Sequence, residues 1–295
     1  MSEETGNRII DLINFFAAHP TEAFTLSDVV EHLPISLGSA HRALKALTDA
    51  RYLSRHPRHK TYSLGLTLVA IGQAALERHP AVSLAREEMS RLTAELGLQC
   101  VATTRVDDEL VSLVKTGVPP GDHGIRRAGE RRPFIPPLGL GHVAWAGAET
   151  TAAYLARGAA RPDHPTHGFL LKSLEVIRQR GYAMAANGPA VRSVWQAIWD
   201  QAARLRDERY WEQMRRLLAG LSRDELQLLT LDQPGAIRLA YISAPVFSPG
   251  GEVLLSISMS GFAEELDADT VSRHVERLCA AAATVTQQIH GQLPR

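Results

Sequence analysis

Cysteine is almost absent from this chain of 295 residues, which contains only Cys100 and Cys279, far apart and outside any Cys-x-x-Cys motif. A disulfide framework and a cysteine-ligated zinc site are therefore not expected, and a reducing cytosol is the expected compartment. The chain also lacks a run of about eighteen apolar residues that could span a bilayer. Its polar, acidic N-terminus lacks the apolar core of a secretory signal, so we expect a cytoplasmic protein without a membrane partner.

Net charge is absent as well, because 32 Lys and Arg residues balance 32 Asp and Glu residues. This balance excludes a uniformly basic nucleic-acid coat, so any electrostatic function must come from local asymmetry. Residues 41–60 carry six basic side chains against Asp49 alone, whereas residues 1–40 carry only Arg8 against six acids. The length and the 45% content of hydrophobic residues favour two folded domains, with positive charge gathered in the first.

Three short helices and a hairpin are predicted in the first 65 residues. Apolar residues at helical spacing predict a first helix that ends at Pro20. A second helix, capped by Thr25 or Ser27, ends before Pro34. Ser36 is expected to cap a third helix, and alternation in residues 51–65 then predicts a β-hairpin, or wing. Helix, turn, basic helix and wing together favour DNA binding, although a three-helix scaffold with a solvated charged face is the alternative.

Residues 8–65 resemble the winged helix-turn-helix of IclR-type bacterial transcription regulators. The resemblance rests on the third helix, in which a serine, small or polar residues, a histidine, an arginine and then leucines follow one another. It implies that double-stranded DNA is a partner. The helix residues implied to meet DNA are Ser36, Ser39, His41, Arg42 and Lys45, and the wing residues are Arg55, Arg58 and Lys60. For Arg42, a base contact and a structural or phosphate contact both stay open.

Residues 66–80 predict a helix that is too hydrophobic for a solvated linker, so it should pack against a partner. In the resembled family this segment joins the domains and contributes to dimerisation, which implies a homodimer or a dimer of dimers. A core helix of the same chain is the alternative. Two later segments, VIRQRGYAMA and ISAPVFSPGGEVLLSISMSGF, resemble the effector domain of the same family. The implied fold is α+β, with a winged helix-turn-helix in residues 1–65, a linker helix in 66–80, and an effector-binding and oligomerisation domain in 81–295. That domain is a GAF-like antiparallel sheet flanked by helices.

The resemblance also implies an effector pocket. Gly139 and Leu140 would hold a carboxylate with backbone amides at a helix start. Ser258 and Ser260 would donate hydroxyls, although ordinary polar strand residues are the alternative, and Leu239 would form an apolar wall. Tyr241 stands where a cysteine is common, and Ala185 where an acid is usual, so the effector of other members does not carry over. The predicted effector is a small organic or aromatic acid.

Residues 190–234 exceed the family's usual short connection and form a helical insertion. Tryptophans and leucines at helical spacing predict two helices there, and Ser222 is expected to cap a third over residues 221–231. Simple packing, a lid over the effector cavity and an oligomer contact are the alternatives for this insertion. No catalytic constellation, metal site or cofactor motif can be assigned, so an enzyme is not predicted. The alternative functions are a winged-helix protein whose second domain only oligomerises and, with less support, an enzyme acting on small acids.

Overall fold

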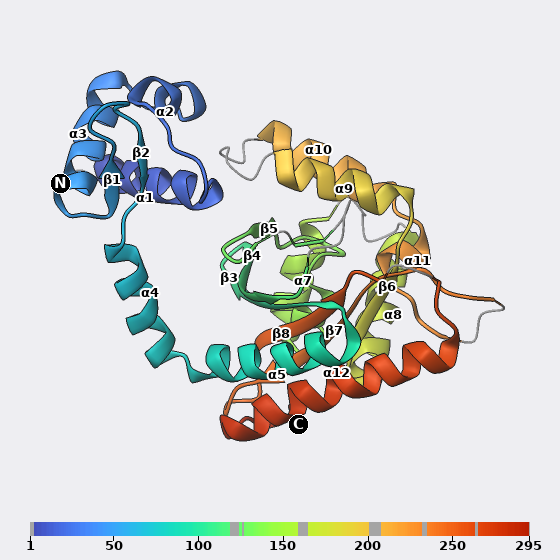
Figure 1. Ribbon diagram of the computed structural model, residues 1–295. Coiled ribbons are helices and arrows are strands. Elements are labelled where there is room, and N and C mark those ends of the chain that lie inside the picture. The colour runs from blue at the N-terminus through green and yellow to red at the C-terminus, as the bar shows by residue number, and fades with distance from the viewer. Residues whose placement is uncertain are drawn as a thin grey trace. The chain divides into compact units, whose positions relative to one another are not determined.

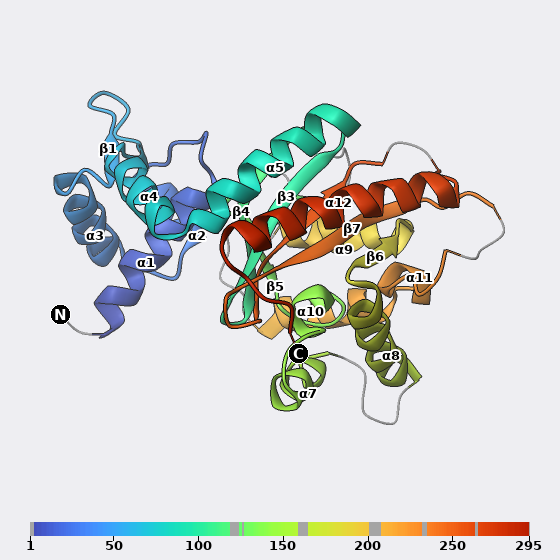
Figure 2. The same ribbon diagram turned by 90° about the horizontal axis from the view of Figure 1, so that it is seen from below.

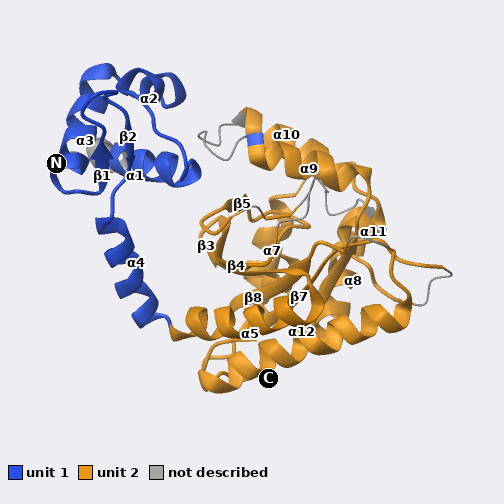
Figure 3. Cartoon of the chain, in the orientation of Figure 1, with its two compact units in different colours: residues 1–79, 200–207 blue, residues 80–199, 208–295 orange. Residues whose placement is uncertain are grey.

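The computed structural model describes residues 3–118, 124–125, 127–158, 165–200, 208–231, 235–262 and 265–294. The chain divides into two compact units: the first contains residues 1–79 and 200–207, and the second contains residues 80–199 and 208–295 (Figure 3). Each unit has its own cluster of buried hydrophobic side chains. None of the described helices is long and apolar enough to cross a membrane.

The first unit contains the predicted three helices and hairpin: α1 (Glu3–Ala18), α2 (Leu26–His32), α3 (Leu37–Asp49), β1 (Leu53–Arg55) and β2 (Tyr62–Leu64) (Figure 1). Thr25, not Ser27, caps α2. Its hydroxyl accepts from the Asp28 amide at 3.2 Å, and the Asp28 carboxylate accepts from the Thr25 amide at 2.7 Å. Ser36 caps α3 by accepting from the Ser39 amide at 3.4 Å. These local bonds satisfy amides that a helix start leaves free, which explains why both helices begin where the sequence predicts.

The apolar face of α3 closes the core of the first unit. Its predicted members, Ala40, Ala43, Leu44 and Leu47, are all buried. The hairpin is tied to the loop before α2 because Phe24 and Tyr62 exchange two backbone hydrogen bonds, at 3.0 and 2.7 Å. This pairing holds the wing in a defined position beside α3.

The helix α4 (Thr67–Arg78) follows the wing, and none of its residues is buried. Three apolar side chains at this segment are widely exposed: Leu66 is 86%, Val69 59% and Ile71 46% accessible. The alternative of a core helix within this chain is therefore wrong. Exposed apolar side chains gathered on one short segment mark a surface that a partner can cover.

The second unit is built on a six-stranded antiparallel sheet in the order β5-β4-β3-β8-β7-β6. Its strands are β3 (Gln99–Val106), β4 (Glu109–Thr116), β5 (Arg131–Pro133), β6 (Ala183–Ala186), β7 (Leu239–Phe247) and β8 (Val253–Ser260). Helices α5 (Pro80–Leu96) and α12 (Ala268–Gln288) lie side by side along the sheet (Figures 1 and 2). Three more helices are α6 (Leu140–Val143), α7 (Ala148–Ala156) and α8 (Pro165–Arg180), and their side chains pack in one cluster with Leu110 and Phe134. The predicted α+β architecture is confirmed.

Three further helices occupy the predicted insertion: α9 (Pro189–Asp200), α10 (Glu208–Ala219) and α11 (Arg223–Leu226). Ser222 caps α11 as predicted, and Glu225 completes the capping box. The predicted extent of this third helix, to residue 231, is wrong. Gln227 is extended with φ −167°, and the Leu228 amide donates to the Met184 carbonyl of β6 at 2.9 Å. The helix ends because the chain pairs with the sheet edge instead.

Candidate functional site

The exposed face of α3 and the adjoining wing form a basic surface on the first unit. Of the eight residues predicted to meet DNA, all are exposed except Ser39, which is half-buried. Lys45 pairs with Asp49 at 2.6 Å, and both side chains are more than 60% accessible. Such an exposed pair contributes little to stability, so Lys45 can exchange Asp49 for a phosphate at small cost.

Ser39 and Arg42 are engaged at the N-terminus of α3. The Ser39 hydroxyl accepts from the Arg42 guanidinium at 3.3 Å and from the Arg8 guanidinium at 3.4 Å. It also accepts from the Ser36 hydroxyl at 3.1 Å. Arg8 therefore joins α1 to α3 through Ser39, whereas the bond of Arg42 to Ser39 lies within α3. A base contact by Arg42 stays a prediction.

The wing turn is organised by His56. Its Nδ1 accepts from the backbone amides of Arg58 at 3.3 Å and His59 at 3.1 Å. The Arg55 guanidinium lies 5.4 Å from the centre of the Tyr62 ring, which is cation–π distance. The turn backbone is thus held by its own residues, while the Arg58 and Lys60 side chains extend into solvent.

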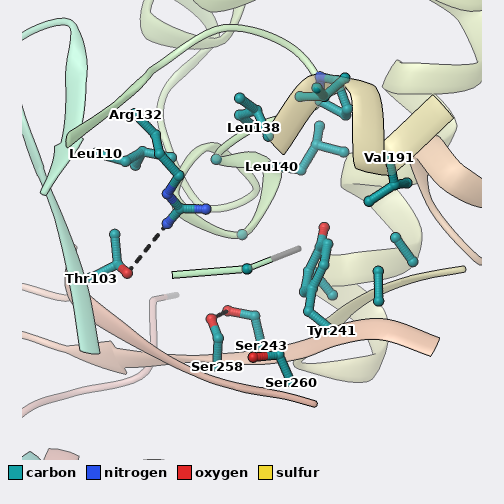
Figure 4. A pocket seen from close by; sticks show the side chains of 18 of the residues that line it. Thr103, Leu110, Arg132, Leu138, Leu140, Val191, Tyr241, Ser243, Ser258 and Ser260 are labelled. Carbon is teal, nitrogen blue, oxygen red and sulfur yellow. Dashed lines mark hydrogen bonds between the residues drawn. The ribbon is translucent and has the colours of Figure 1, made fainter. Parts of the chain in front are cut away.

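A cavity of about 120 Å³ lies in the second unit, bounded by the sheet, the loop before α6 and the helices of the insertion (Figure 4). Five of the six residues predicted to contact an effector line it: Gly139, Leu140, Tyr241, Ser258 and Ser260. Leu239 is fully buried and does not line it, whereas its neighbour Ala240 does. The pairing of β6 with β7 shifts register here, so Ala240 bulges between Leu239 and Tyr241 and the alternation of faces is broken.

The loop at Gly139 offers fewer amides than the sequence predicts. The helix α6 has only four residues, and the Leu140 amide already donates to the Pro137 carbonyl at 3.3 Å. So short a helix adds little dipole to attract an anion. Gly139 is needed for another reason, because its φ is +97° and a Cβ would lie 2.6 Å from the Phe134 ring. It shapes the cavity by letting the loop pass close to that ring.

Hydroxyl groups form the polar side of the cavity. Ser258 donates to Ser243 at 2.9 Å, and Ser260 donates to the Gln99 side chain at 3.1 Å. Figure 4 shows Tyr241, Ser243 and Ser258 side chains directed into the same space. Burial raises the pKa of Tyr241 to about 12, although the Arg132 and Arg180 guanidiniums act in the opposite direction. The phenol is therefore protonated and can donate a hydrogen bond to a ligand.

Residues 7–57 match the IclR helix-turn-helix domain family. The first unit therefore contains an IclR helix-turn-helix domain. The resemblance found in the sequence is confirmed for this part of the chain. No curated protein matches the chain.

Solved structures show that the IclR likeness of the fold extends beyond this domain. An IclR transcriptional regulator from Alicyclobacillus acidocaldarius is 20% identical, with TM-score 0.68 over 98% of this chain and 100% of that one. The Thermotoga maritima IclR is 16% identical, with TM-score 0.60 over 98% and 100%. An IclR homologue from Microbacterium hydrocarbonoxydans, complexed with 4-hydroxybenzoate, is 17% identical, with TM-score 0.63 over 95% and 98%. Both units thus have the fold of IclR regulators.

Within this IclR-type fold, the insertion contributes a wall of the cavity. Its residues Val191, Val194, Trp195, Leu218, Leu221, Glu225 and Leu226 line the space. Val194 and Leu218 also pack in one cluster with Ile135, and Leu138 packs against that cluster. Helices α9 and α10 therefore pack on the loop that carries Leu138 and Gly139, and the packing, lid and oligomer alternatives for the insertion stay open.

Arg132 and His142 also line the cavity, and neither is among the effector-binding residues predicted from the sequence. Arg132 stands in an arginine-rich stretch, and only the antiparallel pairing of Leu110 with Arg132 decides which of these side chains faces inward. Alternation along β5 was the available signal, but the strand has only three residues.

Among the described residues, no three His, Cys, Asp or Glu side chains are grouped so that they could hold a metal ion.

His142 is held as a neutral imidazole. Its Nε2 lies 3.2 Å from the Thr103 carbonyl oxygen and 3.2 Å from the Ser256 hydroxyl. Burial lowers the pKa of His142 to about 4, against the bond to Thr103, which raises it. The neutral ring can donate from Nε2 to the carbonyl, and a second charge beside Arg132 is avoided.

This shift predicts a pH dependence of stability. The unfolded imidazole, with its ordinary pKa of 6.5, binds a proton before the folded one does. Stability is thus complete above pH 6.5 and is lost as pH falls toward 4, by about 1.5 kcal/mol between pH 6.5 and 5. His142→Gln keeps an N–H group that can donate to Thr103. Between pH 6.5 and 5, we expect the free energy of unfolding of this variant, measured in urea, to fall by about 1.5 kcal/mol less than that of the unaltered protein. Equal losses in both proteins would contradict the assignment, since all other groups titrate alike in the pair.

Proposed function

We propose that this protein is a sequence-specific DNA-binding transcription regulator of the IclR type, controlled by a small organic acid bound in the second unit. The observation that carries the proposal is the match of residues 7–57 to the IclR helix-turn-helix domain, on a unit whose third helix and wing expose the basic cluster. Recognition helices of this motif enter the major groove, while lysines and arginines neutralise phosphates. We assign DNA binding to residues 1–65, the linker helix to 66–80 and effector binding to 81–295, with the insertion at about 190–234.

The effector half of the proposal is supported by the cavity. Its volume of about 120 Å³ is of the order of the 150 Å³ apolar cavity that holds benzene, so it suits one small ring. The Microbacterium hydrocarbonoxydans homologue is complexed with 4-hydroxybenzoate, a molecule of this size. A bound acid can change DNA affinity only by favouring one arrangement of the protein over another. The helices of the insertion, which wall the cavity, are well placed for such a response.

The oligomer half of the proposal is supported by α4. The exposed side chains of Leu66, Val69 and Ile71 suit burial against a second copy of the chain. A two-fold dimer would present two recognition helices to half-sites about 34–36 Å apart. We therefore propose a homodimer, or a dimer of dimers, that acts in the cytoplasm and not as an enzyme.

Fluorescence anisotropy with a labelled duplex from the region upstream of the gene tests the proposal. We expect tight, salt-steep binding that a scrambled duplex of equal length does not reproduce, and a changed dissociation constant when a small acid is added. Equal affinity for both duplexes would contradict a sequence-specific regulator. If DNA binds specifically but no organic acid raises the melting temperature, the second unit only assembles the protein, which is the alternative function.

A further inference from the structure

We propose that Arg132 selects a carboxylate in the cavity, so that the ligand is a small monocarboxylic acid with an apolar body. The proposal rests on the effector-binding part of the proposed function and adds the group that recognises the effector. It replaces the helix start at Gly139 as the expected carboxylate site.

The position of Arg132 follows from the pairing of β5 with β4. Neighbouring side chains in a strand point to opposite faces, so Arg131 and Arg132 are separated. Arg131 pairs with Glu109 at 2.6 Å and is exposed. Arg132 lines the cavity, and Figure 4 shows its guanidinium directed into the space between Thr103 and the loop of Leu138. The Trp195 ring of α9 lies 5.5 Å from the guanidinium carbon.

The guanidinium has spare hydrogen-bonding capacity. Its one hydrogen bond to the described residues runs to the Thr103 hydroxyl, at 3.4 Å, and its Nε is buried without a hydrogen-bond partner among them. No carboxylate of the described residues forms an ion pair with it, although Glu130 lies near enough to favour the charged form. Burial lowers the pKa of Arg132, but arginine stays protonated in proteins. A half-buried cation with an unpartnered Nε gains from an anion that pairs with it, and a carboxylate matches its fork with two parallel hydrogen bonds.

The remaining lining limits what that anion can be. Arg132 is the single Lys or Arg among the described lining residues, and His142 is neutral. The single carboxylate there, Glu225, uses one oxygen to cap the Ser222 amide at 2.9 Å. A second negative charge on the ligand would therefore find no cation. The apolar wall of Leu110, Leu138, Leu140 and Val191 favours a hydrocarbon body, and the Tyr241 phenol can bond to a polar substituent on it.

Calorimetric titration of the full chain without DNA tests this inference. The probes are benzoate, 4-hydroxybenzoate and phenylacetate, each beside its neutral amide, which keeps the shape and removes the charge. We expect at least one acid to bind tenfold or more tightly than its amide. Arg132→Met should weaken the binding of that acid by at least tenfold and leave the dissociation constant of the amide nearly unchanged. Arg131→Met, which removes the same charge one residue along the strand, is the matched control and should bind as the unaltered protein does.

Thermal unfolding separates recognition from a structural role. Without ligand, Arg132→Met should melt close to the unaltered protein, because the half-buried guanidinium makes one long hydrogen bond to the described residues and methionine keeps an apolar stem of similar length. With the acid, its melting temperature should no longer rise. Arg132→Lys keeps the charge but loses the forked pair of N–H donors, so it should show an intermediate preference for acid over amide. If the methionine variant does not fold, the lysine variant provides the test instead.

Three results would overturn the assignment: no acid preferred over its amide by the unaltered protein, undiminished acid binding by the Arg132 variants, or an equal loss in Arg131→Met. The regulator proposal fails separately. If the acid binds through Arg132 but DNA is not bound specifically, this inference holds and the regulator proposal is contradicted. If DNA is bound specifically but acid binding does not depend on Arg132, only this inference is contradicted.

Discussion

Lys45→Ala combined with Arg58→Ala is expected to weaken binding to every duplex sequence alike, by about tenfold or more, and to flatten its salt dependence. Each lost phosphate contact lowers the slope of log affinity against log salt by about 0.9, so the double variant should lose about 1.8 per protomer and twice that in a dimer. The change is large because both side chains lie in the exposed basic cluster. Anisotropy titrations at several salt concentrations, on specific and scrambled duplexes, measure it.

Folding should survive this double substitution. Lys45 loses only an exposed ion pair with Asp49, and alanine favours the helix. The Arg58 backbone amide, which donates to His56, is retained. The matched control is Lys172→Ala with Arg178→Ala, which removes the same charge from exposed positions on α8. An unchanged salt slope in the first pair, or an equal change in the control pair, would refute the phosphate contacts.

Gly139→Ala is expected to abolish acid binding in the second unit. A side chain at φ +97° costs about 1–2 kcal/mol, and the new Cβ would lie 2.6 Å from the Phe134 ring. Phe134 is 1% accessible and packs against Tyr154, with ring centres 4.8 Å apart, so it cannot move without disturbing the core. The loop that carries Leu138 and Leu140 must shift instead, and both residues line the cavity. We expect the free energy of unfolding to fall by about 2–4 kcal/mol and the acid-induced rise in melting temperature to disappear.

Gly129→Ala separates strain from collision. Gly129 has φ +82°, but a Cβ there would meet no atom within 4 Å. In this control the free energy of unfolding should therefore fall only by the cost of the strained backbone conformation, and acid binding should be kept. A second variant, Gly139→Ala with Phe134→Leu, makes room for the Cβ and should regain part of the lost stability. Acid binding by Gly139→Ala as tight as that by Gly129→Ala would show that the loop does not shape the site.

The first unit could be derived almost completely from the sequence because its signals are local. The Thr25 and Ser36 caps lie three residues from the amides they satisfy. The buried face of α3 repeats within thirteen residues. Charge clustering, too, is a property of twenty consecutive residues. Signals of this range need no knowledge of how distant segments meet.

The cavity was only partly predictable, since its walls come from residues spread between Val101 and Ser260. Ser258, Ser260 and Tyr241 were proposed by resemblance, but the inward turn of Arg132 depends on the pairing of β5 with β4. The bulge at Ala240 and the early end of α11 likewise follow from pairing with β6. In each case a hydrogen-bonded neighbour far away in the chain overrides the local pattern.

Taken by itself, the amino-acid sequence determined the helix boundaries of the first unit and its basic face. Tertiary structure alone decided which polar groups share one cavity, that the Arg132 side chain lines that cavity while its neighbour Arg131 is exposed, and that the insertion walls the space. The reason is physical: caps and periodic faces arise from bonds within a few residues, whereas strand pairing and burial depend on segments that meet only when the chain has folded.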